Sequence, residues 1–236
     1  MSDNLYAPPQ ADLGTGAPPA IGSGSFDIGR CLSEAWAATW ANFPLWLGFG
    51  IVWVVVALLA TITLIGIIAA VPVLVWGGYV FTLRMHDGGA SLGDMFAGFS
   101  RYGEALGGML GFFLVTFLIR LPGNAAVWIG SASSEYGMIA IGYIAVLGLM
   151  FFVTARLNFA PFLMVDRGVG LGAALNESWA RTADLKLRVA GLMLVMFLVV
   201  FLGTLALLVG ALPGMMVAYM VWVSAYRQIF GGGPQR

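Results

Sequence analysis

Three arginines stand at the ends of long apolar stretches, and their guanidinium groups are the side chains here best suited to binding a ligand. Arg84, Arg156 and Arg227 close similar short tags, Thr-Leu-Arg, Thr-Ala-Arg and Ser-Ala-Tyr-Arg. A guanidinium group donates several hydrogen bonds in a planar fork that matches phosphate. The pattern predicts either a ring of three equivalent arginines that binds anionic lipid headgroups, or side chains that snorkel to the membrane surface and signal topology.

Tryptophans mark the segments that precede these apolar stretches. Trp36 and Trp40 share one face of a segment with helical spacing, while Arg30 and Glu34 lie on the other face. Trp179 occupies the corresponding position late in the chain. Tryptophan favours the headgroup zone of a bilayer, because its ring is buried there while its N–H stays hydrated. We therefore expect short amphipathic helices in the membrane interface, with these three tryptophans as interface or lipid-headgroup contacts. Ser25 or Asp27 is expected to cap the first of these helices, Pro44 suits the first turn of the next helix, and Ser91 with Asp94 predicts a capping box.

The other reactive side chains offer little chemistry. Cys31 is the single cysteine and His86 the single histidine, so cysteine-based and histidine-rich metal sites are both excluded. Glu34, Asp94 and Glu177 occupy equivalent positions on the amphipathic segments and are expected to anchor them through arginine partners rather than to act as acid and base. No phosphate-binding loop, dinucleotide fingerprint or nucleophile elbow is present. We expect no catalytic residue, metal or cofactor.

The composition places the chain in the membrane. It is 60% hydrophobic and 9% charged, whereas soluble domains carry about 25% charged residues. The run from Phe43 to Leu83 contains no charged residue and no histidine. About 20 apolar helical residues cross a bilayer, so this run predicts two spans joined by a turn.

The whole pattern predicts an all-α polytopic protein with six transmembrane helices. The expected spans are 44–64, 67–84, 104–121, 138–156, 189–209 and 212–228. Residues 122–137 are expected to form a polar loop, and the segment from Asn158 to Val165, too short to span, is expected to lie along the surface. Residues 1–24 are rich in proline and glycine and predict a disordered tail. Residues 25–230 would then form one transmembrane domain, followed by a flexible tail at 231–236.

An internal repeat organises these spans. An offset of 143 residues superposes Leu32, Glu34, Trp36, Ala37 and Thr39 on identical residue types, and it also superposes Arg84 on Arg227. The pattern predicts three hairpin repeats, about 25–89, 90–157 and 170–230, each led by an amphipathic interfacial helix. Two spans per unit would make the repeats parallel rather than inverted.

Small residues at four-residue spacing predict close helix contacts. Gly103, Gly107 and Gly111 form one such series, and Gly210 with Gly214 continues the theme near the last span. Packing within one molecule and oligomerisation both remain open for these glycines.

The distribution of basic residues predicts the orientation. With six spans, ten of the 11 basic residues lie on the side that holds both termini, and Arg120 lies on the other side. By the positive-inside rule, both termini are expected in the cytoplasm.

The Ala174-Leu175-x-x-Ser178-Trp179 stretch after Val165-Asp166, and its counterpart around Trp36, carry a family resemblance. In these residues the chain resembles a poorly characterised group of bacterial six-span inner-membrane proteins. The group is related to the membrane domain attached to some glycerophosphodiester phosphodiesterases. The resemblance implies a fold and a bacterial inner membrane, and it implies no activity because no phosphodiesterase domain is present.

These observations predict a non-enzymatic scaffold or accessory subunit that engages lipids or a membrane partner. Its expected partners are the phospholipid bilayer and a membrane protein complex or a second copy of the chain, and not nucleic acid. The alternative is a transporter or channel with a path at the repeat interface. The hydroxyl and amide groups available to line such a path are those of Thr61, Thr63, Tyr79, Thr116, Tyr143, Thr154, Asn158, Thr204 and Tyr219.

Overall fold

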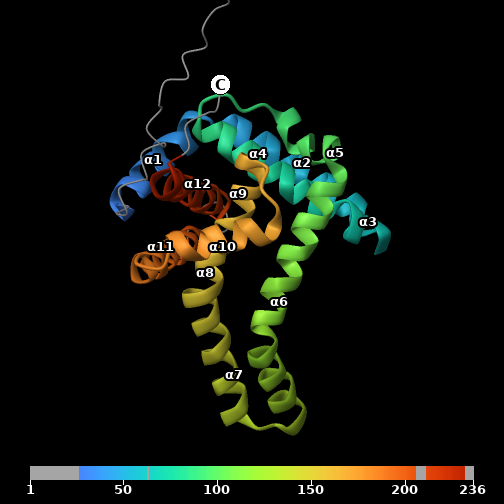
Figure 1. Cartoon of the computed structure of the whole chain (residues 1–236), viewed down its shortest axis with the longest axis vertical. Helices are drawn as coiled ribbons and strands as arrows, with labels where there is room; N and C mark the ends of the chain where they lie inside the picture. The colour runs from blue at the N-terminus through green and yellow to red at the C-terminus, as the bar shows by residue number, and fades with distance from the viewer. Residues whose placement is uncertain (1–26, 63, 206–210, 232–236) are drawn as a thin grey trace, which may run out of the picture.

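A computed structural model describes residues 27–62, 64–205 and 211–231 of the chain, and within these ranges it consists of helices and turns without a strand (Figure 1). The two predicted tails and Gly210 lie outside the described residues, apart from Gly231. The all-α class expected from the sequence is confirmed for the described part of the chain.

The first helices follow local sequence signals closely. Asp27 caps α1 (Ile28–Ala41) by accepting hydrogen bonds from the backbone N–H groups of Gly29 at 2.8 Å and Arg30 at 3.4 Å. Pro44 stands in the first turn of α2 (Phe43–Thr61), where its missing N–H costs nothing. The short α3 (Leu64–Ala69) and then α4 (Val71–His86) return toward α1.

The second amphipathic segment is shorter than expected. The capping box of Ser91 and Asp94 is confirmed, but it opens a 3₁₀ turn, η1 (Leu92–Phe96), followed by the four-residue α5 (Ala97–Ser100). The predicted helix is therefore two short turns that lie against α4.

A two-helix arm then projects from the rest of the structure (Figure 1). It consists of α6 (Tyr102–Ser133) and α7 (Tyr136–Leu149), joined at Ser134, whose φ is 58°. The predicted loop at 122–137 is wrong, because α6 is 32 residues long and continues through Pro122 to Ser133. Gly123 and Gly130, which suggested a loop, lie where α6 and α7 approach each other closely. Arg120, expected at the end of a span, lies instead in the middle of α6.

The segment after the arm enters the core rather than lying on the surface. A π-helical turn, η2 (Met150–Thr154), leads through α8 (Ala155–Leu157) into α9 (Ala160–Arg167). Residues 160–164 are all buried, so the expected surface position of Asn158 to Val165 is wrong. The segment is too short to span but nearly free of polar side chains, and such a helix is stable where it is covered on all sides.

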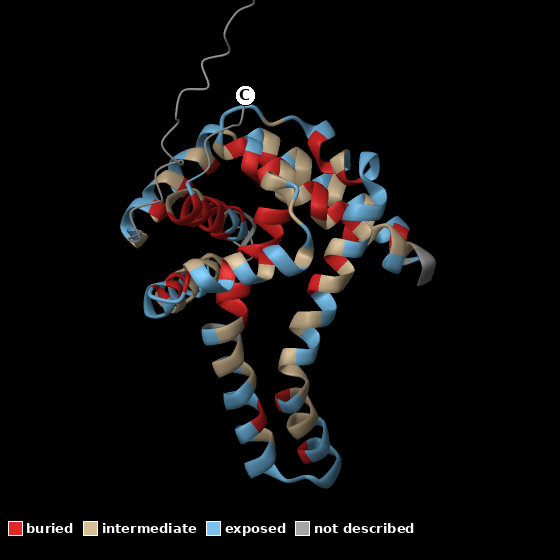
Figure 2. Cartoon of the chain, in the orientation of Figure 1, coloured by how far each residue is buried: buried red, intermediate tan, exposed pale blue. Residues whose placement is uncertain are grey.

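The last three helices complete the structure, and α12 is the most enclosed of them. They are α10 (Leu171–Arg181), α11 (Lys186–Leu205) and α12 (Ala211–Phe230). Helix α12 lies among α1, α4, α9 and α11, and Figure 2 shows it as the most continuously buried helix. Tyr226, Phe230 and Met220 on α12 are among the largest fully buried side chains.

Within the described ranges, five helical segments are long and apolar enough to cross a membrane: Phe43–Ala60, Gly66–His86, Tyr102–Ser133, Tyr136–Arg167 and Lys186–Leu205. Large apolar side chains point outward from them, for example Ile144 with 70% and Leu187 with 72% of its surface exposed. Water would disfavour such an extensive apolar surface, whereas lipid accommodates it. The described part of the chain thus has the character of a multi-pass helical membrane protein.

Candidate functional site

An ionic junction joins the ends of three helices that are far apart in the sequence. We define it by Asp87 after α4, Asp166 on α9, and Tyr226 and Arg227 on α12. Arg227 donates through Nη2 to Asp87 Oδ2 at 2.5 Å and through Nη1 to Asp166 Oδ2 at 3.0 Å. Its side chain is only 9% exposed. The junction therefore holds one mostly buried cation between two carboxylates.

Two further contacts tighten the ionic junction. The Tyr226 hydroxyl donates a hydrogen bond to Asp166 Oδ2 at 2.7 Å, and the Tyr226 ring stacks on Phe162 of α9. One turn earlier on α12, Ser224 Oγ lies 3.2 Å from His86 Nε2 of α4. Helix α12 is thus joined to α4 and α9 by polar contacts at their ends.

Helix α1 closes over the same end of α12. The Asp27 N–H donates to Gln228 Oε1 at 3.1 Å, and Gln228 Nε2 lies 3.5 Å from Glu34 Oε2. Cys31 is fully buried on the inner face of α1, and this burial, together with nearby Glu34, raises the pKa of its thiol to about 12. The cysteine is therefore a protonated packing residue.

Arg156 binds the end of α10. Its Nη2 donates to the Trp179 carbonyl at 2.7 Å and its Nε to Thr182 Oγ1 at 3.1 Å, while the guanidinium lies 3.5 Å from the centre of the Trp179 ring. A cation at a helix C-terminus satisfies carbonyls that lack an intrahelical partner. Arg156 thus fixes α10 on α8.

Arg84 pairs with Asp94 of η1, and its own side chain is 59% exposed. The three predicted headgroup arginines therefore do not share one environment. Arg84 faces outward, whereas Arg156 and Arg227 are enclosed by contacts within the protein. Lipid binding by these residues stays a prediction, and the geometry leaves Arg84 as the most accessible of the three.

The three predicted interface tryptophans lie on the outside. Trp36, Trp40 and Trp179 are 55%, 44% and 43% exposed. The Trp36 and Trp40 rings lie edge to face at 5.5 Å, and Trp40 stacks on Phe43 at 5.1 Å. Their contact with lipid is untested, but their exposure permits it.

The predicted glycine series divides into two environments. A side chain at Gly111 would meet Leu171 at the start of α10, and one at Gly214 would meet the backbone of α11, so both positions allow close packing within one molecule. Gly103 and Gly107 have open space around them and line a small cavity of about 300 Å³ beside Glu104.

The arm is held by glycines that the sequence reasoning missed. A Cβ at Gly142 of α7 would lie 2.8 Å from the Val127 backbone N of α6. A Cβ at Gly123 of α6 would lie 3.2 Å from the Gly142 carbonyl oxygen. Their irregular spacing in the sequence hides a contact that becomes visible only once α6 is known to continue past Pro122.

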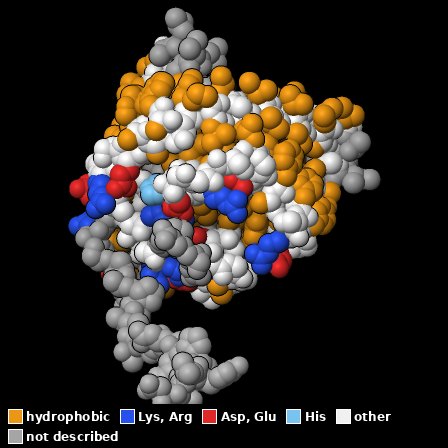
Figure 3. All heavy atoms as spheres, turned by 90° about the horizontal axis from the view of Figure 1, so that it is seen from above, with side chains coloured by type: hydrophobic (Ala, Val, Ile, Leu, Met, Phe, Trp, Pro, Cys, Tyr) orange, Lys and Arg blue, Asp and Glu red, His pale blue; other side chains and the backbone are white. Residues whose placement is uncertain are grey.

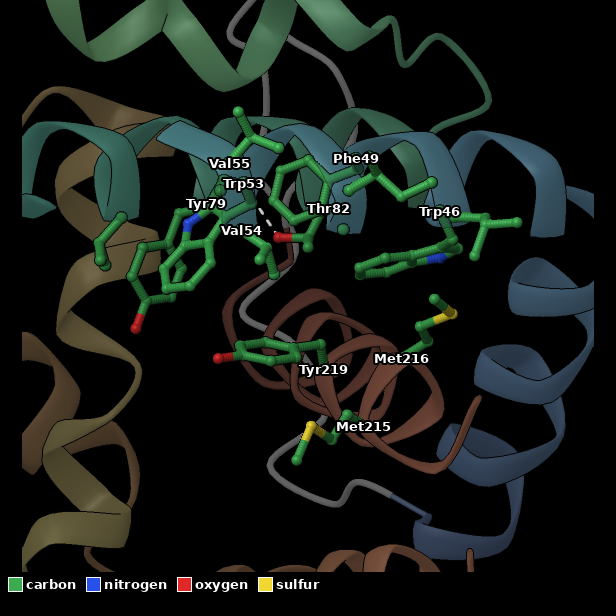
Figure 4. A pocket seen from close by; sticks show the side chains of 15 residues that line it. Trp46, Phe49, Trp53, Val54, Val55, Tyr79, Thr82, Met215, Met216 and Tyr219 are labelled. Atoms are coloured by element: carbon green, nitrogen blue, oxygen red, sulfur yellow. Dashed lines mark hydrogen bonds between the residues drawn. The ribbon is translucent and has the colours of Figure 1, made fainter. Parts of the chain in front are cut away.

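An apolar groove of about 560 Å³ lies between α2, α4 and α12 (Figure 4). Trp46, Phe49 and Val54 of α2 line one wall, Tyr79 belongs to α4, and Tyr219 of α12 faces them. Trp46 is 3% exposed, and its Nε1 has no hydrogen-bond partner. Among the described lining residues, the polar groups are the indole N–H groups of Trp46 and Trp53, two phenol hydroxyls and the Thr82 hydroxyl, which donates to the Tyr79 carbonyl.

The surface seen in Figure 3 has an ionic region and a hydrophobic region. Seen from above, ionic side chains gather in one region beside a broad hydrophobic surface (Figure 3). Among the described residues no group of three or more histidine, cysteine, aspartate and glutamate side chains is arranged to hold a metal ion. The carboxylates of the ionic junction instead share Arg227 as a hydrogen-bonded ion-pair partner.

Sequence reasoning identified Arg227 and missed its partners Asp87 and Asp166. Asp166 was read only as part of a turn, and Asp87 only as polar interface beside His86. One sequence feature could have indicated this pairing. Both carboxylates lie at the ends of apolar segments, on the side of the membrane where Arg227 is also expected.

Comparison of the chain with models of protein families, with curated proteins and with solved structures found no match. The function is therefore argued from the geometry.

Proposed function

We propose that the chain is a non-enzymatic scaffold or accessory protein of the bacterial inner membrane that engages lipids or a membrane partner through its apolar outer faces. The observation that carries the proposal is the ionic junction, in which Arg227 binds both Asp87 and Asp166. These ionic groups bind one another rather than presenting a reactive centre. The large apolar surfaces of α2, α11 and the arm remain available to the surroundings.

The proposal includes six spans, with α12 as the sixth. Helix α12 has 20 residues but carries Ser224, Tyr226, Arg227 and Gln228 in its second half. A more polar helix is compatible with a membrane when other helices cover it, because its polar groups then find protein partners. The burial of α12 supports this position.

Three equivalent hairpins are part of the same proposal. Arg84 reaches Asp94 of η1, and Arg156 reaches the end of α10, so each binds the amphipathic segment that follows it. Gln228, the residue after Arg227, lies next to Glu34 of α1. Since α1 is the first amphipathic segment, the last unit contacts the first. This cyclic order of contacts supports an internal repeat.

The transport alternative receives less support because the expected polar groups are scattered. The Thr116 and Thr204 hydroxyls donate to carbonyls of their own helices, at 2.9 and 2.8 Å. Tyr143 is 57% exposed on the arm. Tyr79 and Tyr219 share a groove, but its other walls are apolar.

Purification in nanodiscs, followed by native mass spectrometry of lipid and protein, tests the proposal. We expect phospholipid or a membrane subunit retained in stoichiometric amount, and no solute flux when the protein is reconstituted in vesicles. Complete delipidation to a bare monomer would contradict the proposal, and a saturable flux would favour the transporter.

The orientation is tested separately with single cysteines in a Cys31→Ala background. Glu135→Cys at the tip of the arm should react with a membrane-impermeant maleimide from outside the cell. Gly89→Cys, in the turn after α4, should react only after the membrane is opened. The reverse result would overturn the cytoplasmic placement of the termini.

A further inference from the structure

We propose that the groove between α2, α4 and α12 holds one acyl chain of a phospholipid and that the Trp46 indole N–H donates a hydrogen bond to an ester carbonyl of that lipid. This inference rests on the proposed function, because it assigns a lipid site to a lipid-engaging protein. Four observations carry it: the lining, the unpartnered N–H, the length of the groove and its lateral opening.

The lining selects an uncharged apolar ligand. Valine, leucine, isoleucine, phenylalanine and methionine side chains dominate the walls, and no lysine, arginine, aspartate or glutamate lines them. The carboxylate of a free fatty acid would find no counter-ion there, and an unpaired charge in apolar surroundings is costly. An esterified chain has the same apolar tail without that charge.

Trp46 supplies the one polar group that requires a ligand. Its side chain is 3% exposed, and its Nε1 is covered by neighbouring atoms and has no partner within the described protein. The proposed hydrogen bond therefore requires the indole ring to turn toward the groove when the lipid binds. An unsatisfied buried donor is destabilising, and a buried tryptophan N–H usually finds an acceptor. The carbonyl oxygen of a glycerol ester is an acceptor that can lie beside the start of an acyl chain.

The position of Trp46 fits the depth of an ester group. It lies one turn into α2, close to the junction with α1, where Trp36 and Trp40 are exposed. Exposed tryptophans favour the interfacial zone, and the ester groups of phospholipids lie between the headgroups and the hydrocarbon. From Trp46 the groove then follows α2 toward Val55.

The length of the groove corresponds to one leaflet. Val55 lies nine positions after Trp46 in α2, and this distance is about 14 Å along a helix at a rise of 1.5 Å per residue. The hydrocarbon core of a bilayer is about 30 Å thick, so the groove reaches about half of this depth. Ile51, Val54 and Met215 at its edges are 50–59% exposed, so a chain can enter laterally.

The test uses the full chain in vesicles of phosphatidylethanolamine and phosphatidylglycerol that contain a small fraction of a photoreactive probe. One arm carries a phospholipid with a diazirine in the middle of one acyl chain, and the other arm carries the corresponding free fatty acid. After illumination, mass spectrometry locates the adducts. We expect phospholipid adducts to concentrate on Val54, Val55, Tyr79 and Tyr219, with weaker labelling by the fatty acid.

Variants separate the groove from general contact with lipid. Gly50 lines the groove, and a Cβ there would meet nothing within 4 Å, so Gly50→Phe and the milder Gly50→Leu should fill it and lower groove adducts roughly tenfold. Gly148→Phe is the matched control, because Gly148 of α7 also has open space around it and does not line the groove. Retention of helical content and elution volume by each variant excludes misfolding.

A conservative pair isolates the hydrogen bond. Trp46→Phe keeps an aromatic ring but removes the N–H, and it should lower groove adducts about fivefold, as expected for loss of one hydrogen bond of about 1 kcal/mol. Trp53→Phe is the control, since Trp53 also lines the groove and its N–H is not among the buried groups without a partner.

The outcomes are distinct. Adducts spread evenly over α11 and the arm, or unchanged by Gly50→Phe, would overturn the groove site, and retained lipid would then leave the proposed function standing. Stronger labelling by the fatty acid would overturn the phospholipid assignment. A wild-type protein that retains neither lipid nor subunit would overturn the proposed function and this inference together.

Discussion

Arg227 of α12 donates to the carboxylate of Asp87 at the end of α4, although 140 residues separate them. The same guanidinium group also binds Asp166 of α9, which follows the arm. One side chain of α12 thus connects the ends of α4 and α9.

Replacement of Arg227 with methionine should destabilise the protein by up to about 3–5 kcal/mol, because it removes the guanidinium group that binds both Asp87 and Asp166, whose side chains are 21% exposed. Equilibrium unfolding by SDS in mixed micelles measures this change. The triple variant Asp87→Asn, Asp166→Asn and Arg227→Met should regain most of the loss, because the unpaired charges are removed.

The matched control for Arg227 is Arg101→Gln. Arg101 pairs with Glu104, but the two side chains are 50% and 59% exposed, and exposed pairs contribute about 0–1 kcal/mol. Equal effects at Arg227 and Arg101 would contradict a structural role for the ionic junction.

Cys31 should be unreactive until α1 leaves α12. The thiol is fully buried, and burial, with Glu34 nearby, raises its pKa to about 12, so at pH 8 it is both covered and protonated. Maleimide labelling should be slow in mild detergent and fast in SDS. Asp27→Ala removes the N-cap of α1, worth about 1 kcal/mol, and should raise the native labelling rate about fivefold. Equal rates in both detergents would show that α1 is not docked.

Arg156→Lys tests whether this residue acts by its charge or by its shape. A lysine keeps the positive charge but lacks the planar fork that reaches both the Trp179 carbonyl and Thr182 Oγ1. We expect a loss of about 1.5–3 kcal/mol, the usual contribution of one hydrogen bond from a charged donor, measured by SDS unfolding. Unchanged stability with lysine and loss with glutamine would favour the topological or headgroup role instead.

Gly142→Ala should weaken the arm. The new methyl group would lie 2.8 Å from the Val127 backbone N, so α6 and α7 would have to separate; the cost expected for such overpacking is about 1–3 kcal/mol. Gly148→Ala in the same helix has open space and should be neutral or slightly stabilising, by up to about 1 kcal/mol. The distance between spin labels on the two helices, measured by pulsed EPR, should increase only in Gly142→Ala.

The success of the sequence predictions follows the range of the interactions involved. The cap at Asp27, the proline in the first turn of α2 and the capping box of Ser91 and Asp94 depend on neighbouring residues, and all three are confirmed. The charge-free run from Phe43 to Leu83 likewise predicted two helices of spanning length, since apolar length is a local property. The two spans expected over 189–228 are matched only in part, because α11 is long and apolar enough to cross a membrane and α12 is not among such helices in the described part of the chain.

The errors concern contacts across the structure. Gly123 and Gly130 suggested a loop because glycine is a poor helix former, yet in α6 the close approach of α7 compensates for that preference. The position of α9 in the core depends on the helices that cover it. The Trp46 groove needs α2, α4 and α12 together, and no local pattern marks such a site.

The contact between Asp27 and Gln228 has a consequence for biosynthesis. Helix α1 leaves the ribosome among the first structured segments, but the helix that buries its inner face is α12, which is translated last among the described helices. Until then Cys31, Ala35 and Thr39 lack their cover. That face of α1 therefore stays uncovered by its partner helix throughout elongation, and α1 can dock only after α12 has been made.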